Sequence, residues 1–114
     1  MPVKKYEEIK MSPVKMEGVL DTVKANVIGP EEGWDTHTLR VFRIAPGGNT
    51  PFHQHDYEHV NYVIRGRGRL RIADDVQVIR EKDFALVPPN VKHQFMNPYD
   101  EDFEFICIVP NRGA

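Results

Sequence analysis

The chain has almost no cysteine. Its 114 residues include one, Cys107, so no disulfide can form within the chain. A chain of this length buries roughly two-thirds of its unfolded surface, which is enough for stability without covalent cross-links. A single free thiol is typical of a protein from a reducing compartment, and we therefore expect a cytoplasmic protein.

Strong net charge and long apolar runs are also missing. The formal net charge is −2 at pH 7, so electrostatics give no reason to expect nucleic acid or an anionic membrane as a partner. The longest apolar stretch, residues 105–109, is far shorter than a membrane span. The first eight residues lack the apolar core of a secretion signal. With 40% hydrophobic and 28% charged residues, the composition is that of an ordinary globular protein of one domain.

Helical periodicity is nearly absent, and short β-branched and aromatic runs take its place. Glycine, proline, asparagine or aspartate separates these runs, and Asp74 and Asp75 mark a tight hairpin turn. Many short strands with turns roughly every 8–12 residues are typical of an all-β sandwich or barrel. The predicted strands lie at residues 19–28, 36–44, 58–65, 67–73, 76–80, 83–88, 91–96 and 103–109.

The least patterned part of the sequence is its beginning. We expect residues 1–16 to form an N-terminal arm and residues 17–114 to form the single β-domain. A short chain with many strands exposes sheet edges, and the arm could cover such an edge on a neighbouring subunit. The sequence therefore predicts a homodimer.

Histidine provides the clearest chemical signal. His53, His55 and His59 fall within seven residues, and His93 follows later in the chain. Imidazole is a common ligand for divalent transition metals, and residues i and i+2 of a strand point to the same face, so His53 and His55 project together. The sequence therefore predicts a metal site. His37 lies outside this set and is expected at the surface.

The spacing of these residues resembles the two sequence motifs of the cupin superfamily. The matching residues are the glycine, His-x-His pair and closing glycine of the first motif and the proline, histidine and asparagine of the second: Gly47, His53, His55, Gly66, Pro88, His93 and Asn97. The resemblance covers roughly residues 40–110. It implies a double-stranded antiparallel β-barrel, or jelly roll, with a metal inside the barrel.

Three positions depart from the family pattern. His59 replaces the metal-binding glutamate of the first motif, so the resemblance implies a shell of four histidines. Glu58 competes with His59 for this place, but it stands only two residues after His55, which is too close for the motif. Lys82 and Asn90 replace the glycines of the second motif. Asparagine tolerates left-handed backbone, whereas Lys82 is expected to sit in a looser turn.

The predicted ligand set bears on the identity of the metal. A four-histidine shell in a chain of this length resembles small single-domain cupins that bind manganese, so Mn(II) is the favoured cofactor. The ligand types also suit Fe(II), Ni(II), Zn(II) and Cu(II). Four neutral imidazoles leave the charge of a divalent ion uncompensated, which favours anionic ligands.

Side-chain parity indicates which residues line a substrate pocket. Phe95 follows His93 by two residues, and Asn61 has the same parity as His59. In the cupin barrel the final strand runs near the metal, and an inward Arg40 could bind a substrate carboxylate through its planar fork. The predicted pocket residues are Arg40, Asn61, Phe95, Phe105 and Cys107. Arg40 and Cys107 are the candidates for a catalytic role, although a buried cysteine is more often a small hydrophobe.

These features predict a metal-dependent enzyme that acts on a small organic molecule such as a carboxylate. The expected chemistry is oxygenation of the dioxygenase type or another oxidative cleavage, and isomerisation or decarboxylation through an enolate stays open. A non-catalytic small-molecule-binding or sensor protein is the alternative from a different class, because a fold alone does not decide function.

Overall fold

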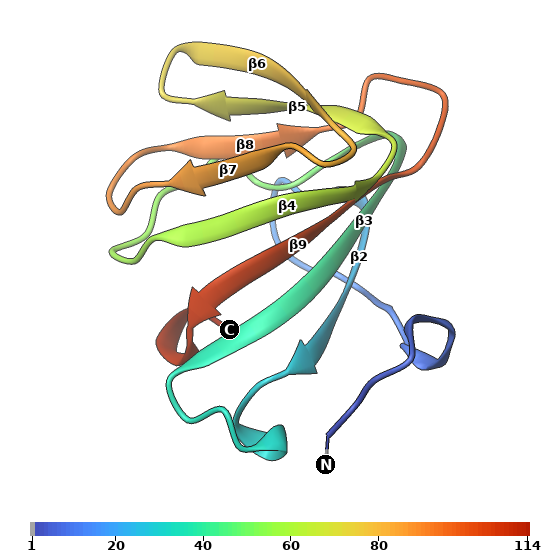
Figure 1. Cartoon of the computed structure of the whole chain (residues 1–114). Helices are drawn as coiled ribbons and strands as arrows, with labels where there is room; N and C mark the ends of the chain where they lie inside the picture. Colours follow the sequence, from blue (N-terminus) through green and yellow to red (C-terminus); the bar gives the residue numbers. More distant parts are fainter. Residues whose placement is uncertain (1) are drawn as a thin grey trace.

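The computed structural model describes residues 2–114, which form nine strands and three short 3-10 helices (Figure 1). The strands are β1 (Ser12–Pro13), β2 (Leu20–Ile28), β3 (His37–Asn49), β4 (His59–Arg65), β5 (Arg67–Ile72), β6 (Asp75–Arg80), β7 (Phe84–Val87), β8 (His93–Met96) and β9 (Phe103–Pro110). The helices are η1 (Tyr6–Glu8), η2 (Pro30–Glu32) and η3 (Asn111–Gly113).

The strands form one antiparallel sheet that curls on itself (Figure 1). Neighbouring strands follow the order β6-β5-β8-β3-β9-β4-β7, and β2 pairs with both β3 and β1. The long strand β3 pairs with β2 and β9 along most of its length and with β8 at Asn49. One strand therefore contributes to both halves of the barrel, and the expected all-β jelly roll is confirmed.

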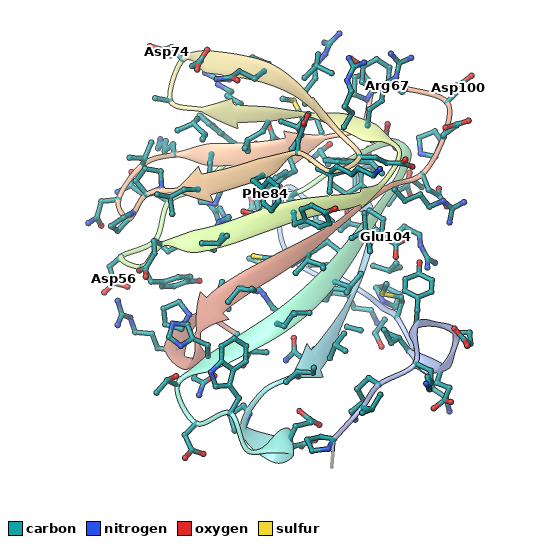
Figure 2. All side chains as sticks on the ribbon, in the orientation of Figure 1. Asp56, Arg67, Asp74, Phe84, Asp100 and Glu104 are labelled. Carbon is teal, nitrogen blue, oxygen red and sulfur yellow. The ribbon has the colours of Figure 1, made fainter. Side chains whose placement is uncertain are left out.

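Each of the eight predicted strands is present, with three local differences. The strand β3 continues to Asn49, because residues 45–48 form a bulge at a register shift in its pairing with β2. The tight turn occupies Ala73 and Asp74 instead of Asp74 and Asp75, since Asp75 already pairs with Ile72. Asp74 lies at the tip of this hairpin (Figure 2). The two-residue strand β1 was not predicted, because it is too short to carry a pattern.

Phenylalanines from β8 and β9 form the centre of the core. Phe95, Phe103 and Phe105 are each less than 5% exposed. The rings of Phe95 and Phe105 stack with centroids 4.2 Å apart, and those of Phe103 and Phe105 lie 5.1 Å apart. Aromatic pairs at such distances stabilise a core beyond the area that they bury. Along β9 the predicted alternation is present, with Phe103, Phe105, Cys107 and Val109 all buried.

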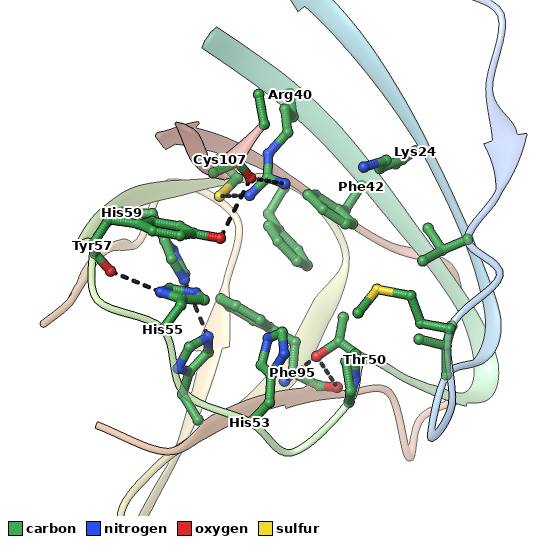
Figure 3. A pocket seen from close by; sticks show the side chains of 18 residues that line it. Lys24, Arg40, Phe42, Thr50, His53, His55, Tyr57, His59, Phe95 and Cys107 are labelled. Atoms are coloured by element: carbon green, nitrogen blue, oxygen red, sulfur yellow. Dashed lines mark hydrogen bonds between the residues drawn. The ribbon is translucent and has the colours of Figure 1, made fainter. Parts of the chain in front are cut away.

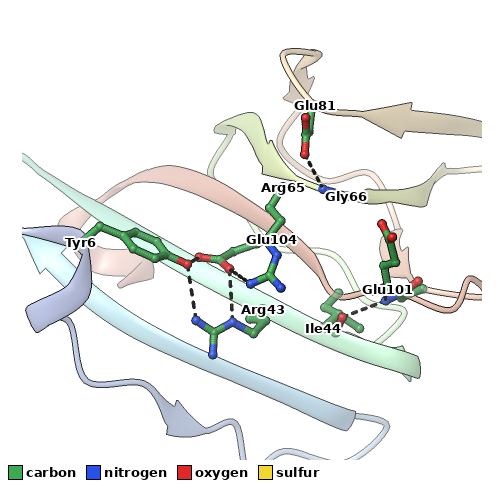
Figure 4. Close-up of polar contacts among 9 residues, drawn as sticks. Tyr6, Arg43, Ile44, Arg65, Gly66, Glu81, Glu101 and Glu104 are labelled. Atoms are coloured by element: carbon green, nitrogen blue, oxygen red, sulfur yellow. Dashed lines mark hydrogen bonds and ion pairs between the residues drawn. The ribbon is translucent and has the colours of Figure 1, made fainter.

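Glu104 places a fully buried carboxylate on β9, between the strand's inward phenylalanines. Arg43 Nε donates to Glu104 Oε2 at 3.1 Å, and the Tyr6 hydroxyl donates to the other carboxylate oxygen (Figure 4). The Arg65 guanidinium lies 4.0 Å from Oε2. A buried charge requires such partners. Because Tyr6 belongs to η1, this cluster attaches the N-terminal segment to the barrel of its own chain.

The segment predicted as an arm makes a second contact with its own chain. Ser12 and Pro13 of β1 pair with Lys24 and Val23 of β2. Met1, the first residue of the predicted arm, lies outside the described residues. The homodimer expected from the sequence stays a prediction.

The two residues that replace the glycines of the second motif both adopt left-handed backbone. The φ angles are +74° at Lys82 and +62° at Asn90. The Lys82 amide donates to the carbonyl of Val63 at 2.9 Å, which fixes the turn. The looser turn expected at Lys82 is therefore wrong: lysine occupies a conformation that costs it roughly 1–2 kcal/mol and costs glycine almost nothing.

We expect Lys82→Gly to raise the free energy of unfolding by about 1 kcal/mol, because relief of the left-handed backbone outweighs the added freedom of glycine in the unfolded chain. Urea denaturation of the two proteins measures this difference. Lys82→Ala is the matched control, since alanine keeps the strained backbone, and it should change stability by less than about 0.5 kcal/mol. A Lys82→Gly protein less stable than the parent would contradict the explanation.

Candidate metal centre

The four histidines of the predicted metal site come from three parts of the barrel. His53 and His55 lie in the loop after β3, His59 begins β4 and His93 begins β8. Two backbone hydrogen bonds join the loop to β8: His53 N donates to His93 O at 3.2 Å, and His93 N donates to His53 O at 2.9 Å. We call these four residues the histidine cluster.

The imidazole rings of the histidine cluster lie close together (Figure 3). Ring centroids are 5.4 Å apart for His53 and His55, 4.8 Å for His55 and His93, and 5.0 Å for His59 and His93. Ring nitrogens of His53, His55 and His93 all lie within 4.8 Å of one another, so these three could hold a metal ion. His59 Nε2 lies 3.3 Å from His93 Nε2, which brings the fourth ring to the same place.

Hydrogen bonds fix the orientation of three of these rings. The Nδ1 atoms of His55 and His93 lie 2.8 and 2.9 Å from the carbonyl oxygens of Tyr57 and Val91. A carbonyl oxygen can only accept, so each Nδ1 carries the proton. Each Nε2 then presents a lone pair to the cluster, which is the arrangement that metal-binding histidines require.

Asn61 performs the same task for His59. Its side-chain Oδ1 lies 2.7 Å from His59 Nδ1, and its Nδ2 donates to the carbonyl of Ile106 at 3.3 Å. The second bond determines which end of the amide faces the histidine, so Asn61 Oδ1 accepts a hydrogen bond from His59 Nδ1. Asn61 was predicted as a pocket residue from its parity. It lies behind His59 and orients the ring.

The structure separates the two candidates for the third ligand position. His59 is 3% exposed, and its Nε2 points to His93. Glu58 is exposed. Adjacent residues on an extended strand point to opposite faces, so only one of the two can face the barrel interior.

Burial favours the neutral form of three histidines of the cluster, His53, His59 and His93. It lowers the pKa of His59 to about 3, and it also lowers the pKa values of His53 and His93. With Nδ1 protonated on both rings, the Nε2 atoms of His59 and His93 direct lone pairs at each other across 3.3 Å. A shared cation would relieve this repulsion, so the donor set fits a divalent metal.

A cavity of about 270 Å³ adjoins the histidine cluster (Figure 3). Four of the five predicted pocket residues line it: Arg40, Phe95, Phe105 and Cys107. The residues that sequence reasoning missed include Lys24, Phe42, Thr50 and Tyr57. Tyr57 stacks on His55 with centroids 3.9 Å apart and planes at 1°. A pattern of apolar residues gives no signal for such a loop residue or for a lysine within a strand.

The two candidates for a catalytic role contact each other. Arg40 Nη2 donates to Cys107 Sγ at 3.1 Å, and Cys107 is 2% exposed. Burial raises the pKa of the Cys107 thiol, and the nearby Arg40 charge opposes this only in part. The thiol therefore stays protonated at neutral pH and is a poor nucleophile. His37, predicted at the surface, stacks on Trp34 with centroids 5.4 Å apart, outside this site.

Comparison with known proteins decides the family. The family model of the cupin domain matches residues 40–109. The chain belongs to the cupin family. Among residues 2–114, this cupin has no helix long and apolar enough to cross a membrane.

Three relatives are informative. The cupin is 32% identical over 74 residues to 1-methylthio-D-xylulose 5-phosphate methylsulfurylase of Rhodospirillum rubrum, covering 65% of the chain and 47% of that protein. It is 32% identical over 75 residues to auxin-binding protein 1 of Arabidopsis thaliana, covering 58% and 38%. The chain therefore spans about half or less of these curated relatives. The solved structure of the polyketide cyclase RemF from Streptomyces resistomycificus has a TM-score of 0.90 and 25% identity, covering 96% of this chain and 79% of that one.

We expect His59→Ala and Glu58→Ala to differ sharply in metal affinity. Loss of an outer-shell partner typically weakens a site by roughly 10–100-fold, and loss of the His59 nitrogen should weaken it at least as much. Glu58→Ala should bind metal like the parent protein. Chelator competition measures the affinities, and circular dichroism checks the fold. Loss of metal binding in Glu58→Ala, with metal binding retained in His59→Ala, would contradict the assignment of His59 as the third ligand.

We also expect the metal-free protein to lose stability below about pH 6.5, the ordinary pKa of histidine. The unfolded chain then binds protons at histidines that stay neutral in the folded chain, so falling pH favours unfolding until the folded pKa is reached, about 3 for His59. Urea denaturation in EDTA between pH 5 and pH 8 measures this. In His59→Gln the free energy of unfolding should depend less on pH. An unchanged pH dependence would contradict the assignment of this effect to His59.

Proposed function

We propose that this cupin is a metal-dependent enzyme that acts on a small organic molecule. The observation that carries the proposal is the orientation of the histidine cluster beside the cavity. Backbone carbonyls and Asn61 hold the protons of three Nδ1 atoms, so that Nε2 lone pairs converge on one place. In a purely structural role, buried histidines would have no need of converging lone pairs.

The metal would be held by His53, His55, His59 and His93, and Mn(II) is the ion that we favour. Fe(II), Ni(II), Zn(II) and Cu(II) suit the same donors. The bound ion would polarise an oxygen atom of the substrate as a Lewis acid. The protein orients the ligand rings and excludes water from the site. Tyr57 stacks on His55, and the Phe95 and Phe105 rings form an apolar wall that excludes water.

The names of two relatives support an enzyme. A methylsulfurylase and a polyketide cyclase are both catalysts, and each is similar to this chain over a large part of the barrel. From the ligand set we propose oxygenation or another oxidative cleavage first. Isomerisation or decarboxylation through an enolate is the oxygen-independent alternative.

A ligand-binding protein without turnover is the second candidate. The similarity to auxin-binding protein 1, whose name describes binding, favours it. The cavity of about 270 Å³ would suit a small signal molecule as well as a substrate. Turnover therefore separates the two candidates.

We expect conversion of a bound metabolite to follow metal occupancy. Small molecules that raise the melting temperature of the Mn(II)- or Fe(II)-loaded protein would be incubated with it in air and under anaerobic conditions, and products would be measured by mass spectrometry. Conversion only in air identifies the oxidative reaction, and conversion in both identifies an isomerase or lyase. Removal of metal by EDTA should abolish either one. Binders that no metal form converts would favour the sensor.

A further inference from the structure

Two cationic side chains line the cavity, and neither forms an ion pair among residues 2–114. Lys24 and Arg40 both line it, and none of its lining side chains is an aspartate or glutamate. The ion pairs found among residues 2–114 involve other cations: Lys4, Arg43, Arg65, Arg71 and Arg112. Partly buried cations without counter-ions are costly, so an anion from outside the chain is the natural complement.

The strand register places the two cations near each other. Lys24 on β2 pairs with Phe42 on β3, and Asn26 pairs with Arg40. Cross-strand partners point to the same face, so Lys24 and Arg40 are diagonal neighbours on the cavity side of the sheet. Burial lowers the pKa of Lys24, and the Arg40 charge lowers it further. No carboxylate among residues 2–114 opposes this effect.

Arg40 is held in place by weak or neutral partners. Its Nη2 donates to Cys107 Sγ at 3.1 Å, its Nη1 donates to the carbonyl of Gly113 at 3.3 Å, and its guanidinium lies 4.9 Å from the centroid of Phe42. Its Nε is buried and has no hydrogen-bond partner among residues 2–114. A buried N–H without an acceptor costs roughly 1–3 kcal/mol. A purely structural Arg40 would explain the bond to Gly113 but not the unpaired Lys24.

We propose that Lys24 and Arg40 form a carboxylate-binding subsite, and that the substrate is a small organic acid with an apolar, unsaturated body. This inference rests on the proposed function, because it names the substrate of the same metal centre. The rings of Phe42, Phe105 and Phe95 stack in sequence and give the cavity an apolar wall. A sugar would leave its hydroxyls unpaired against that wall, whereas a planar apolar body fits it.

The number of available donors favours a carboxylate over a phosphate. Arg40 Nη1 and Nη2 each carry a second N–H beyond those donated to Gly113 and Cys107, and Lys24 offers the donors of a single ammonium. Two carboxylate oxygens can be satisfied by these groups. Phosphate sites usually add several backbone N–H donors from a glycine-rich loop or a helix N-terminus.

The test measures the binding of benzoate, benzamide and phenyl phosphate to metal-depleted protein by calorimetry. Benzoate should bind at least tenfold more tightly than benzamide, its neutral isostere, and more tightly than phenyl phosphate. Because no metal is present, this result does not depend on the metal-dependent turnover that tests the proposed function. Equal binding of benzoate and benzamide would overturn the subsite, and tighter binding of phenyl phosphate would overturn the carboxylate assignment.

Variants identify the residues responsible. Lys24→Gln and Arg40→Gln should each weaken benzoate binding about tenfold and leave benzamide binding unchanged. Lys24→Arg should keep the benzoate affinity of the parent protein, because arginine retains the positive charge. Lys92→Gln removes an exposed cation that lies over Phe52, away from the cavity lining, and should change nothing. Unchanged benzoate affinity in folded Lys24→Gln and Arg40→Gln would overturn the proposal. If a variant fails to fold, the comparison of benzoate with benzamide on the parent protein still tests it.

Discussion

Two backbone hydrogen bonds between His53 and His93 join the loop after β3 to the start of β8, and the histidine cluster depends on them. The loop after β3 carries two of the four imidazoles, and the bonds from Thr50 N to Phe95 O and from Asn90 N to His55 O attach it further. Hydrogen bonds from the rings then complete the arrangement, because the carbonyl oxygens of Tyr57 and Val91 and the side-chain Oδ1 of Asn61 each accept a hydrogen bond from a histidine Nδ1. The ring nitrogens that could bind a metal are thus already oriented, which would reduce the cost of binding.

The apolar interior of the barrel strengthens the electrostatic interactions of these polar groups. Phe95 lies 6.2 Å from His59 between ring centroids and also stacks on Phe105, so one ring contacts both the core and the metal centre. Charges interact more strongly where water is excluded. The same burial that lowers the pKa values of His53, His59 and His93 also makes the unpaired Arg40 and Lys24 costly. The proposed affinities for a metal and for an anion would therefore have a common physical cause.

Much of the fold and the histidine cluster could be predicted from the sequence, because both leave local signals. Alternation along β9 identified the inward face that carries Phe105 and Cys107. Histidine spacing identified the residues that meet at the cluster, since His53 and His55 lie in one short loop.

Features that depend on pairing between distant segments could not be predicted from local sequence patterns. Parity assigned Asn61 to the pocket, but only the side-chain bonds show that it supports His59 from behind. Lys24 faces the cavity because β2 pairs with β3 in one register, and no local pattern determines that register. The left-handed backbone at Lys82 could not be predicted for a different reason. A glycine at this position would indicate a positive φ angle, whereas a lysine does not.

The central claim is that four imidazoles, and no carboxylate, surround one metal ion. Anomalous diffraction from crystals of Mn(II)-loaded protein tests it most directly. The account predicts one anomalous peak in contact with ring nitrogens of His53, His55, His59 and His93, with Nε2 as the ligand atom of the last three. A peak bound by the Glu58 carboxylate with His59 turned away, or a peak outside the histidine cluster, would contradict it.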